Sequence, residues 1–259
     1  MSDQFRAETT TKIERITRLL RTENLGGALL NTQSNFAWAT AGGDNGIDRS
    51  RENGAASILI RRDGKRYVLA SRIEMPRILA EEVSAEDYEP IEFSWEEERA
   101  TPDFTGKLAA RLLADGETLG ADVALGANVK TIENQIAKCR YELTTGEIER
   151  YRALGADAGE AIGELARTVQ PGASENEIAR RAADALAAKN IRSVVLLVAA
   201  DERLSRFRHP LPTEKAWEKV LMIVVGARRG GADRVAFAHR LRRKRSRRFA
   251  AENRSAGAH

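Results

Sequence analysis

Residues 193–227, which read SVVLLVAADERLSRFRHPLPTEKAWEKVLMIVVGA, contain two apolar runs joined by a polar segment with two prolines. Short apolar runs rich in valine, leucine and isoleucine are typical of buried β-strands. We therefore expect strands over Ser193–Ala200 and Val220–Gly226. Pro210 and Pro212 stiffen the connection between them, because proline fixes its own backbone φ angle.

Two helix start signals lie upstream of these runs. Thr144 with Glu147, and Ser174 with Glu177, have the spacing of a capping box, in which a hydroxyl and a carboxylate satisfy free backbone N–H groups. Apolar residues recur at helical spacing after each signal. We therefore expect a long helix that ends at Pro171-Gly172 and a second, shorter helix that leads into the first strand.

The N-terminal half alternates helical and strand patterns. Arg62-Asp63-Gly64-Lys65 predicts a β-hairpin, because glycine accepts the positive φ angle that tight turns require. The expected helices cover 13–25, 73–83 and 104–113, and the expected strands cover 28–31, 56–60, 66–70 and 89–93. This alternation predicts an α/β (α+β) fold class with a mixed sheet. A change of composition near Tyr141 separates a first domain, residues 1–143, from a second, residues 144–231.

Composition excludes several classes of protein. The chain has 259 residues, of which 42% are hydrophobic and 31% charged, so it can bury a core and is not disordered throughout. No apolar run reaches the roughly 18 residues of a membrane span, and the polar N-terminus has no signal-peptide pattern. We expect a soluble, cytoplasmic protein. The single cysteine, Cys139, excludes an internal disulfide and a CxxC zinc site, and we expect it to be an inert, partly buried thiol.

Positive charge is concentrated at the C-terminal end of the sequence. Segment 232–259 contains nine lysines or arginines and two acids, a net charge of +7, whereas the rest of the chain carries −3. Three interpretations of this basic tail remain open. Its clustered arginines can bind the phosphates of a nucleic acid, or it can be a plain disordered tail. It can also be the product of a reading frame shifted by one nucleotide in a GC-rich gene.

Few side chains in the folded part can carry catalysis. The chain has no glycine-rich phosphate loop, no His-Glu-x-x-His and no Gly-x-Ser-x-Gly motif. His209 is the one histidine outside the basic tail. Its imidazole can exchange a proton or hydrogen-bond a substrate carbonyl, but it can equally be a loop histidine bonded to backbone or solvent. Asp44 and Asp48 loosely resemble a calcium loop without its closing glutamate, which disfavours a calcium site.

The order of elements from Thr144 to Gly231 resembles the catalytic half of the aminopeptidase P, prolidase and creatinase family, whose fold is called pita-bread. The matching motifs are Val169-Gln170-Pro171-Gly172, Ser174–Ala179, the first apolar strand, His209–Thr213 and Val220–Ala227. Residues 12–83 are similar to the N-terminal domain of the same family, including Asn35–Gly42 and the hairpin. The resemblance implies a creatinase-type mixed-sheet domain followed by a partial pita-bread domain.

Members of this family hydrolyse a C–N bond with two divalent metals, such as manganese or cobalt, held by two Asp, one His and two Glu. The resemblance places the first Asp at Val224, which cannot ligate a metal, and the remaining ligands beyond Gly231. We therefore expect no metal and no other cofactor in this chain. His209 matches the family histidine that contacts substrate or moves a proton. In creatinase, the metal-free branch, this histidine is the central acid–base group, so the resemblance makes His209 the candidate catalytic residue.

The resemblance ends at Gly231, inside an element that continues in the family as a strand of the catalytic sheet. When segment 232–259 is back-translated and read one nucleotide later, the code allows a strand, a glycine turn and a helix start. Serine then stands where the second metal Asp belongs. The frameshift interpretation implies a chain truncated within its catalytic domain. We also expect the positive charges to keep the tail out of the sheet, which leaves Thr144–Gly231 looser than Lys12–Leu143.

These inferences lead to two hypotheses. In the first, the chain is an Xaa-Pro aminopeptidase-like or creatinase-like hydrolase relative, inactive through truncation and loss of metal ligands, whose lineage acts on a small peptide or guanidino substrate. In the second, it is a non-catalytic binding protein with weak nucleic-acid affinity from the basic tail. Dimers are common in the family, so a homodimer is a further expectation. We expect no membrane partner and no specific nucleic-acid partner.

Overall fold

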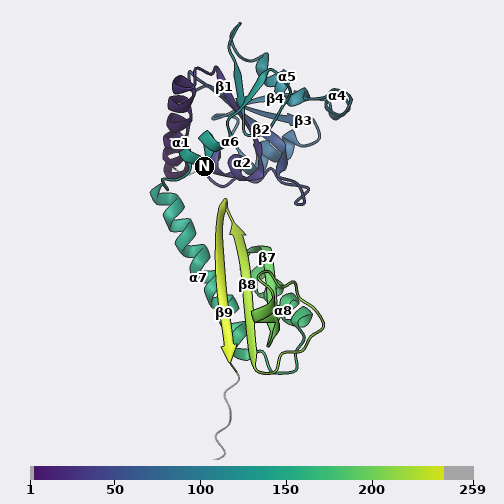
Figure 1. Ribbon diagram of the computed structural model, residues 1–259. Coiled ribbons are helices and arrows are strands. Elements are labelled where there is room, and N and C mark those ends of the chain that lie inside the picture. Colours follow the sequence, from purple (N-terminus) through teal and green to yellow (C-terminus); the bar gives the residue numbers. More distant parts are fainter. Residues whose placement is uncertain (1–2, 242–259) are drawn as a thin grey trace, which may run out of the picture. The chain divides into compact units, whose positions relative to one another are not determined.

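The computed structural model describes residues 3–241 and divides the chain into two units (Figure 1). The first unit runs to Arg152 and includes Gly230–Ala232, and the second runs from Ala153 to Arg229 and continues from Asp233. The division lies inside a helix, later than the boundary expected after residue 143. No helix in the range 3–241 is long and apolar enough to cross a membrane.

A six-stranded mixed sheet forms the centre of the first unit, with strand order β4-β3-β2-β1-β5-β6. The strands are β1 (Gly27–Thr32), β2 (Asn53–Arg61), β3 (Arg66–Ser71), β4 (Glu89–Phe93), β5 (Leu119–Ala121) and β6 (Val129–Thr131). β2 is antiparallel to both of its neighbours, whereas the other pairs are parallel. The chain first adds β3 and β4 on one side of the centre and then crosses to add β5 and β6 on the other.

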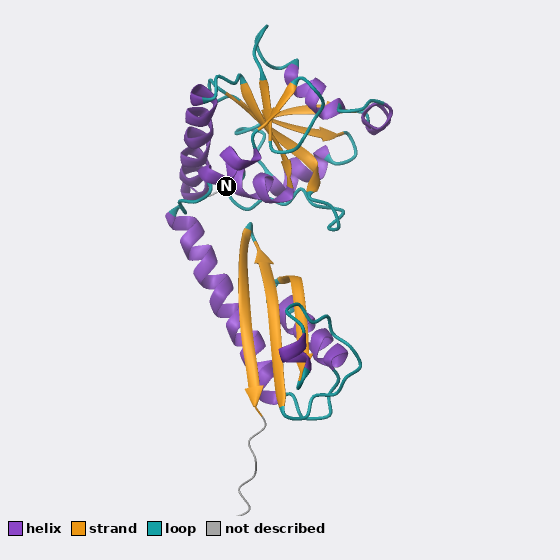
Figure 2. Cartoon of the chain, in the orientation of Figure 1, coloured by secondary structure: helices purple, strands orange, loops and turns teal. Residues whose placement is uncertain are grey.

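Helices cover both faces of this sheet, which gives three layers (Figure 1, Figure 2). One face is packed by α1 (Asp3–Thr22), α2 (Gln33–Ala39), α3 (Met75–Arg77) with the π-helical turn η1 (Ile78–Glu82), and α6 (Glu133–Cys139). Their apolar side chains meet alternate strand residues such as Leu30 and Ile58. The opposite face carries Leu29 and Leu59 and is covered by α5 (Phe104–Ala110). Helix α4 (Trp95–Ala100) follows β4.

The hairpin and the main strands of the first unit agree with the sequence patterns. Asp63-Gly64 lies in the turn between β2 and β3, and Gly64 has a φ angle of +90°. Helix α1 is longer than expected because it starts at Asp3, and the helix expected over 73–83 is α3 followed by η1, with Pro76 in the first turn. The pattern does not predict α2, α4, α6, β5 or β6. Each has seven residues or fewer, which is too few to show a clear periodicity of apolar residues.

The second unit combines helices with a three-stranded sheet of order β7-β8-β9. Its elements are the C-terminal part of α7 (Thr145–Thr168), α8 (Glu175–Ala187), β7 (Arg192–Ala200), α9 (Arg203–Arg206), β8 (Val220–Arg229) and β9 (Ala232–Leu241). Both hydroxyls cap their helices as predicted, but among the described residues the carboxylate half of the capping box forms only at Glu147. Glu147 N donates to Thr144 Oγ1, and Glu177 N donates to Ser174 Oγ.

Strand β9 corrects the prediction that the segment after Gly231 stays out of the sheet. Ala232–Leu241 lies beside β8, so the described sheet has a third strand. The reason is the distribution of charge. Of the nine basic residues, Arg234 and Arg240 lie in the strand, and the other seven lie beyond Leu241. Residues 242–259 are outside the described part of the chain, so the three interpretations of the basic tail remain predictions.

Strand β7 is less buried than its apolar sequence predicts. Val198–Ala200 is fully buried, whereas Val194 and Val195 are 44% and 46% exposed. β7 is an edge strand of the described sheet, and a bulge between Ser193 and Val195 shifts its pairing with β8. Exposed edges of this kind offer unpaired backbone groups to another strand.

Candidate functional site

His209 lies in the connection between β7 and β8, just after the short helix α9. Its side chain is exposed, and no residue in the described range is hydrogen-bonded to the imidazole. Phe207 and Leu211, on either side of it along the chain, are 50% and 69% exposed. The ring is therefore accessible to a ligand, as proton transfer or hydrogen bonding to a substrate requires.

The carboxylate of Glu175 holds the residues that follow His209. Glu175 lies in the first turn of α8, and its side chain is fully buried. Its Oε1 accepts a hydrogen bond from Ala200 N at 2.8 Å. Its Oε2 accepts two from Thr213, from N at 2.9 Å and from Oγ1 at 2.7 Å. The guanidinium of Arg203 forms an ion pair with the same oxygen.

These contacts join three separate segments at one buried charge. Helix α8, the end of β7 and the connection at Thr213 all meet the Glu175 carboxylate. Arg203 adds a hydrogen bond from Nη2 to Leu211 O at 3.0 Å. A buried carboxylate without donors is strongly unfavourable, so these donors make its burial tolerable. The connection is therefore fixed on the C-terminal side of His209.

Asp201 fixes the start of β8 in a similar way. It has a φ angle of +54°, and its carboxylate accepts hydrogen bonds from the backbone N–H groups of Glu218, Lys219 and Val220 at 2.8–3.0 Å. Burial raises the pKa of Asp201, but these N–H groups outweigh it and hold the pKa below its usual value. The sequence pattern alone indicates no more than a polar residue at the end of a strand.

The rest of the connection is hydrogen-bonded to the segment that leads into the first turn of α8. Carbonyl oxygens of Thr213 and Trp217 accept backbone N–H groups from segment 172–176, each at 2.9 Å. Trp217 is fully buried, and its Nε1 donates to Gln170 O at 2.8 Å. Proline stiffening, which the sequence predicts, is therefore one of several constraints on this connection.

The residue to which the sequence resemblance assigns the family's first metal ligand belongs to the sheet core. Val224 is buried in β8, opposite Leu197 of β7, and has no atom that can bind a metal. Among residues 3–241, no three His, Cys, Asp or Glu side chains gather in a way that could hold a metal ion. The residues present do not fit a two-metal centre, and no metal-dependent step can be derived from them.

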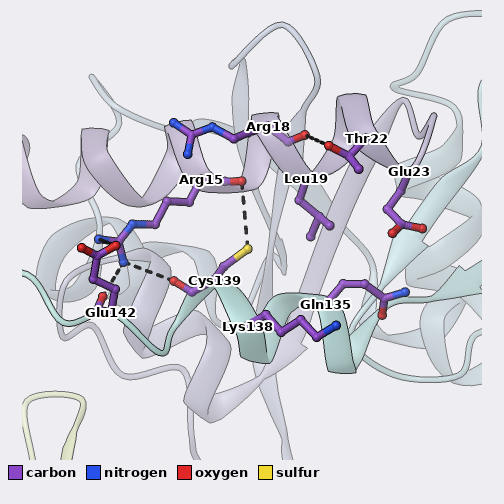
Figure 3. A pocket seen from close by; sticks show the side chains of 9 residues that line it. All are labelled: Arg15, Arg18, Leu19, Thr22, Glu23, Gln135, Lys138, Cys139 and Glu142. Carbon is purple, nitrogen blue, oxygen red and sulfur yellow. Dashed lines mark hydrogen bonds and ion pairs between the residues drawn. The ribbon is translucent and has the colours of Figure 1, made fainter.

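Cys139 lines a cavity of about 380 Å³ between α1 and α6 (Figure 3). Arg15 Nη1 donates to the carbonyl of Cys139 at 3.2 Å, and Arg15 Nη2 lies 3.7 Å from the Glu142 carboxylate. Partial burial raises the pKa of the thiol, although Arg15 and Arg18 oppose this effect. A raised pKa lowers the fraction of thiolate, which is the nucleophilic form of the side chain. The inert role of Cys139 stays a prediction.

A mixed-sheet unit, a long helix, a capped second helix and an antiparallel sheet define the class of pita-bread, prolidase-type α/β folds. Solved structures confirm this fold class. Prolidase from Pyrococcus furiosus has a TM-score of 0.68 and 16% identity, over 88% of this chain and 70% of that chain. X-Pro aminopeptidase from Thermotoga maritima has a TM-score of 0.62 and 19% identity, over 90% of this chain and 66% of that chain.

The fold is not confined to proteins named as peptidases. The N-terminal domain of a FACT complex subunit from chickpea (Cicer arietinum) has a TM-score of 0.63 and 10% identity, over 90% of this chain and 65% of that chain. No protein-family model matches the chain, and no curated protein matches its sequence. At these identities the similarity establishes the fold of this chain, which spans about two thirds of the structures it matches.

Proposed function

We propose that this chain is a peptidase-like relative of the Xaa-Pro hydrolases that contacts a small peptide or guanidino substrate through His209, without a two-metal centre. The observation that carries the proposal is the exposed imidazole of His209 on a connection fixed by buried Glu175. A fixed, accessible imidazole can hydrogen-bond a carbonyl group or exchange a proton near neutral pH. The prolidase-type fold supports the substrate class.

In this proposal the chain binds such a substrate but does not hydrolyse it at an enzymatic rate. The resemblance assigns a metal ligand to the position of Val224, whose side chain cannot bind a metal, so in this proposal no metal-activated water is supplied there. Within the described residues, no carboxylate orients the His209 ring. One imidazole without an orienting partner or a group that stabilises the developing charge is an incomplete catalytic site.

The test combines metal analysis, binding and turnover on the full-length chain. We expect elemental analysis to find no stoichiometric manganese, cobalt or zinc. We expect titration calorimetry to detect binding of an Xaa-Pro dipeptide or of creatine. The bound compound should remain unhydrolysed. His209→Ala should weaken this binding about tenfold, as expected for one lost hydrogen bond, whereas the matched variant His259→Ala should not.

A second variant tests whether Glu175 positions the connection that carries His209, separately from the contact of His209 with the substrate. Glu175→Gln keeps the shape of the side chain but removes its charge, so it should loosen the connection and weaken binding while His209 remains. Glu177→Gln, in the same helix but partly exposed, is the control. Tightly held metal together with dipeptide hydrolysis would contradict the proposal, and so would affinity that His209→Ala leaves unchanged.

A non-catalytic interaction protein is the second candidate function. It is favoured by the exposed Phe207 and Leu211 beside His209, and by the fold shared with a FACT complex subunit. Exposed apolar side chains that cluster on one loop are typical of protein contact sites. If this candidate is correct, dipeptides and creatine will show no binding that depends on His209, and a Phe207→Ala, Leu211→Ala double variant will lose binding to the partner protein.

Nucleic-acid affinity of the basic tail is a minor part of that second proposal. The tail offers phosphate contacts without a group that reads bases, so binding should be weak, sequence-independent and strongly reduced by salt. Removal of residues 232–259 should abolish it. Sequence-selective binding at physiological salt, or binding that survives this deletion, would be inconsistent with a role of the tail alone.

A further inference from the structure

A cavity of about 490 Å³ lies in the first unit, at the end of the six-stranded sheet where most strands have their carboxyl ends. Five strands run in the same direction and have their carboxyl ends here, namely β1, β3, β4, β5 and β6. The antiparallel strand β2 begins at the same end of the sheet. The chain changes the side on which it adds strands after β4, so the sheet has a topological switch point. Open α/β sheets commonly bind ligands at the carboxyl ends of strands beside such a point, in cavities of this size.

On the sheet face that lines the cavity, the side chains change from apolar to polar toward the carboxyl ends of the strands. Side chains two residues apart share a face, so the positions Asn31, Ser57 and Ser71 continue the face of the buried leucines 29, 59 and 69. All three polar side chains line the cavity and are 6–7% exposed. Polar residues at buried sheet positions need partners, because an unpaired buried polar group is costly.

Ser71 lacks such a partner. Ser57 Oγ donates to Asn31 Oδ1 at 2.9 Å, and Asn31 Nδ2 donates to Asp122 Oδ1 at 3.1 Å. The hydroxyl of Ser71 makes no hydrogen bond to any residue in the described range, and its oxygen is not among the buried atoms without a partner, so it is open to the cavity. The hydroxyl is therefore free to hydrogen-bond a ligand atom in the cavity.

Two opposite charges on α4 line the same cavity. Glu98 and Arg99 are adjacent in the helix, and adjacent helical side chains do not face each other, so they do not neutralise one another. Neither forms an ion pair within the described part of the chain. Glu98 Oε1 has a long contact of 3.3 Å with Thr105 Oγ1, and partial burial raises the pKa of Glu98. A cationic ligand group beside Glu98 would favour its ionised form.

The other charged residues of the lining already have partners. Glu74 lies 3.8 Å from Arg77, and Arg51 lies 3.0 Å from Asp48. The uncompensated charges are therefore one carboxylate and one guanidinium, which match a ligand with one positive and one negative group. Phe93 and Trp95 add an apolar wall to the cavity.

We propose that this cavity binds a small zwitterion of the size of a free amino acid or a dipeptide. Its ammonium group lies at Glu98, its carboxylate at Arg99 and Ser71, and its side chain against Phe93 and Trp95. None of these residues belongs to the His209 connection, so the inference does not depend on the proposed function.

Titration calorimetry on the full-length chain tests the charge requirement. A panel of the common amino acids and matching dipeptides should contain binders. The N-acetyl and the amide derivatives of the best binder, which each lack one charge, should bind about 10- to 100-fold more weakly. Tighter binding of the dipeptide assigns the site to short peptides, and tighter binding of the amino acid assigns it to free amino acids; both results support a zwitterion site.

Matched variants locate the site. Glu98→Gln and Arg99→Gln should each weaken binding about tenfold or more, because each removes one charge-assisted contact. Glu97→Gln and Arg111→Gln remove the same charges from exposed positions outside the lining and should bind normally. In His209→Ala this cavity should also keep its affinity, and only a second, separate binding event at the His209 connection should weaken. All these side chains are exposed, and circular dichroism checks that each variant is folded. No binding across the panel, equal binding of the neutral derivatives, or full affinity in both α4 variants would overturn the proposal.

Discussion

Lys12 shows how a single residue can join two parts of the first unit. Its side chain is fully buried, and its Nζ donates to Glu8 Oε1 at 2.6 Å and to Trp38 O at 2.8 Å. The same nitrogen lies 3.1 Å from Glu147 Oε1. Arg150 forms two hydrogen bonds with Glu8, at 2.6 and 2.9 Å. Two carboxylates thus share two cations, which offsets the cost of burying all four groups.

Replacement of Lys12 by Met should lower the free energy of unfolding by about 3–5 kcal/mol, because Glu8 and Glu147 then remain buried without the cation between them. Urea denaturation followed by tryptophan fluorescence measures the change. Lys107→Met, at an exposed position of α5, is the matched control and should change stability by less than about 0.5 kcal/mol. Equal stability of the two variants would show that the network contributes little.

Glu8 should make this stability sensitive to acid. Burial raises its pKa, but hydrogen bonds from Arg150 and Lys12 outweigh burial and leave the pKa below the usual value of 4.5. A carboxylate with a lowered folded pKa contributes stability above its unfolded pKa, and this contribution is lost as the pH falls through the folded value. Urea denaturation at a series of pH values should therefore show a loss of stability below 4.5 that is smaller in Glu8→Gln. Identical acid curves for both proteins would contradict this assignment.

At the scale of elements, the two capped helices differ although their start signals are alike. At α7 the capping box is reciprocal, since Glu147 Oε2 accepts from Thr144 N at 2.8 Å and Glu147 N donates to Thr144 Oγ1 at 3.2 Å. At α8 the bond from Glu177 N to Ser174 Oγ forms, but the Glu177 carboxylate lies 3.7 Å from Arg181. Buried Lys12 holds Glu147 in place, and Glu177 has no such neighbour among the described residues.

The difference predicts unequal effects of the same substitution. Glu147→Ala removes a cap and a buried ionic partner, and should cost about 2–4 kcal/mol of unfolding free energy. Glu177→Ala removes a partly exposed ion pair and should cost less than about 0.5 kcal/mol. Thr144→Ala and Ser174→Ala, which each remove a capping hydroxyl, should each cost about 1 kcal/mol. Chemical denaturation of the four variants measures these values, and equal losses for the two glutamates would contradict the argument.

At the scale of the whole molecule, the two units differ in how their sheets are covered. The six-stranded sheet has apolar clusters on both faces. The three-stranded sheet leaves Val194 and Val195 of its edge strand β7 about half exposed. Backbone groups at an exposed edge open more readily than those inside a covered sheet. Strand β9 removes the reason that the sequence analysis gave for a looser second unit, and the looseness stays a prediction that now rests on the exposed edge strand β7.

Hydrogen exchange measured by mass spectrometry tests this prediction. Amides of β1, β2 and β3 should exchange slowest, and those of Arg192–Val195 much faster. Amides at the end of β7, near the fully buried Ala200 and its bond to Glu175, should be intermediate. If the second unit proves as protected as the first, the difference in coverage does not control local opening.

The sequence by itself determined the main elements and the fold class. Apolar runs, capping boxes and the Asp-Gly turn are local signals, so they can be recognised in the sequence without knowledge of the rest of the molecule. His209 was identifiable as a candidate for the same reason, because it is the one histidine outside the basic tail. The short elements α2, α6, β5 and β6 carry too few residues for such a signal.

Only the tertiary structure decided which polar residues are buried and what they hold. Glu175 meets Ala200 and Thr213 across 25 and 38 residues of sequence, and its neighbour Glu177 in the same helix stays partly exposed. Ser71, one residue beyond the strand expected over 66–70, lines a cavity together with residues from distant segments. The charged segment after Gly231 begins with a strand because β8 lies beside it. The physical reason is common to all of these: the free energy of a polar group depends on its burial and on partners from distant segments, and a local pattern records neither.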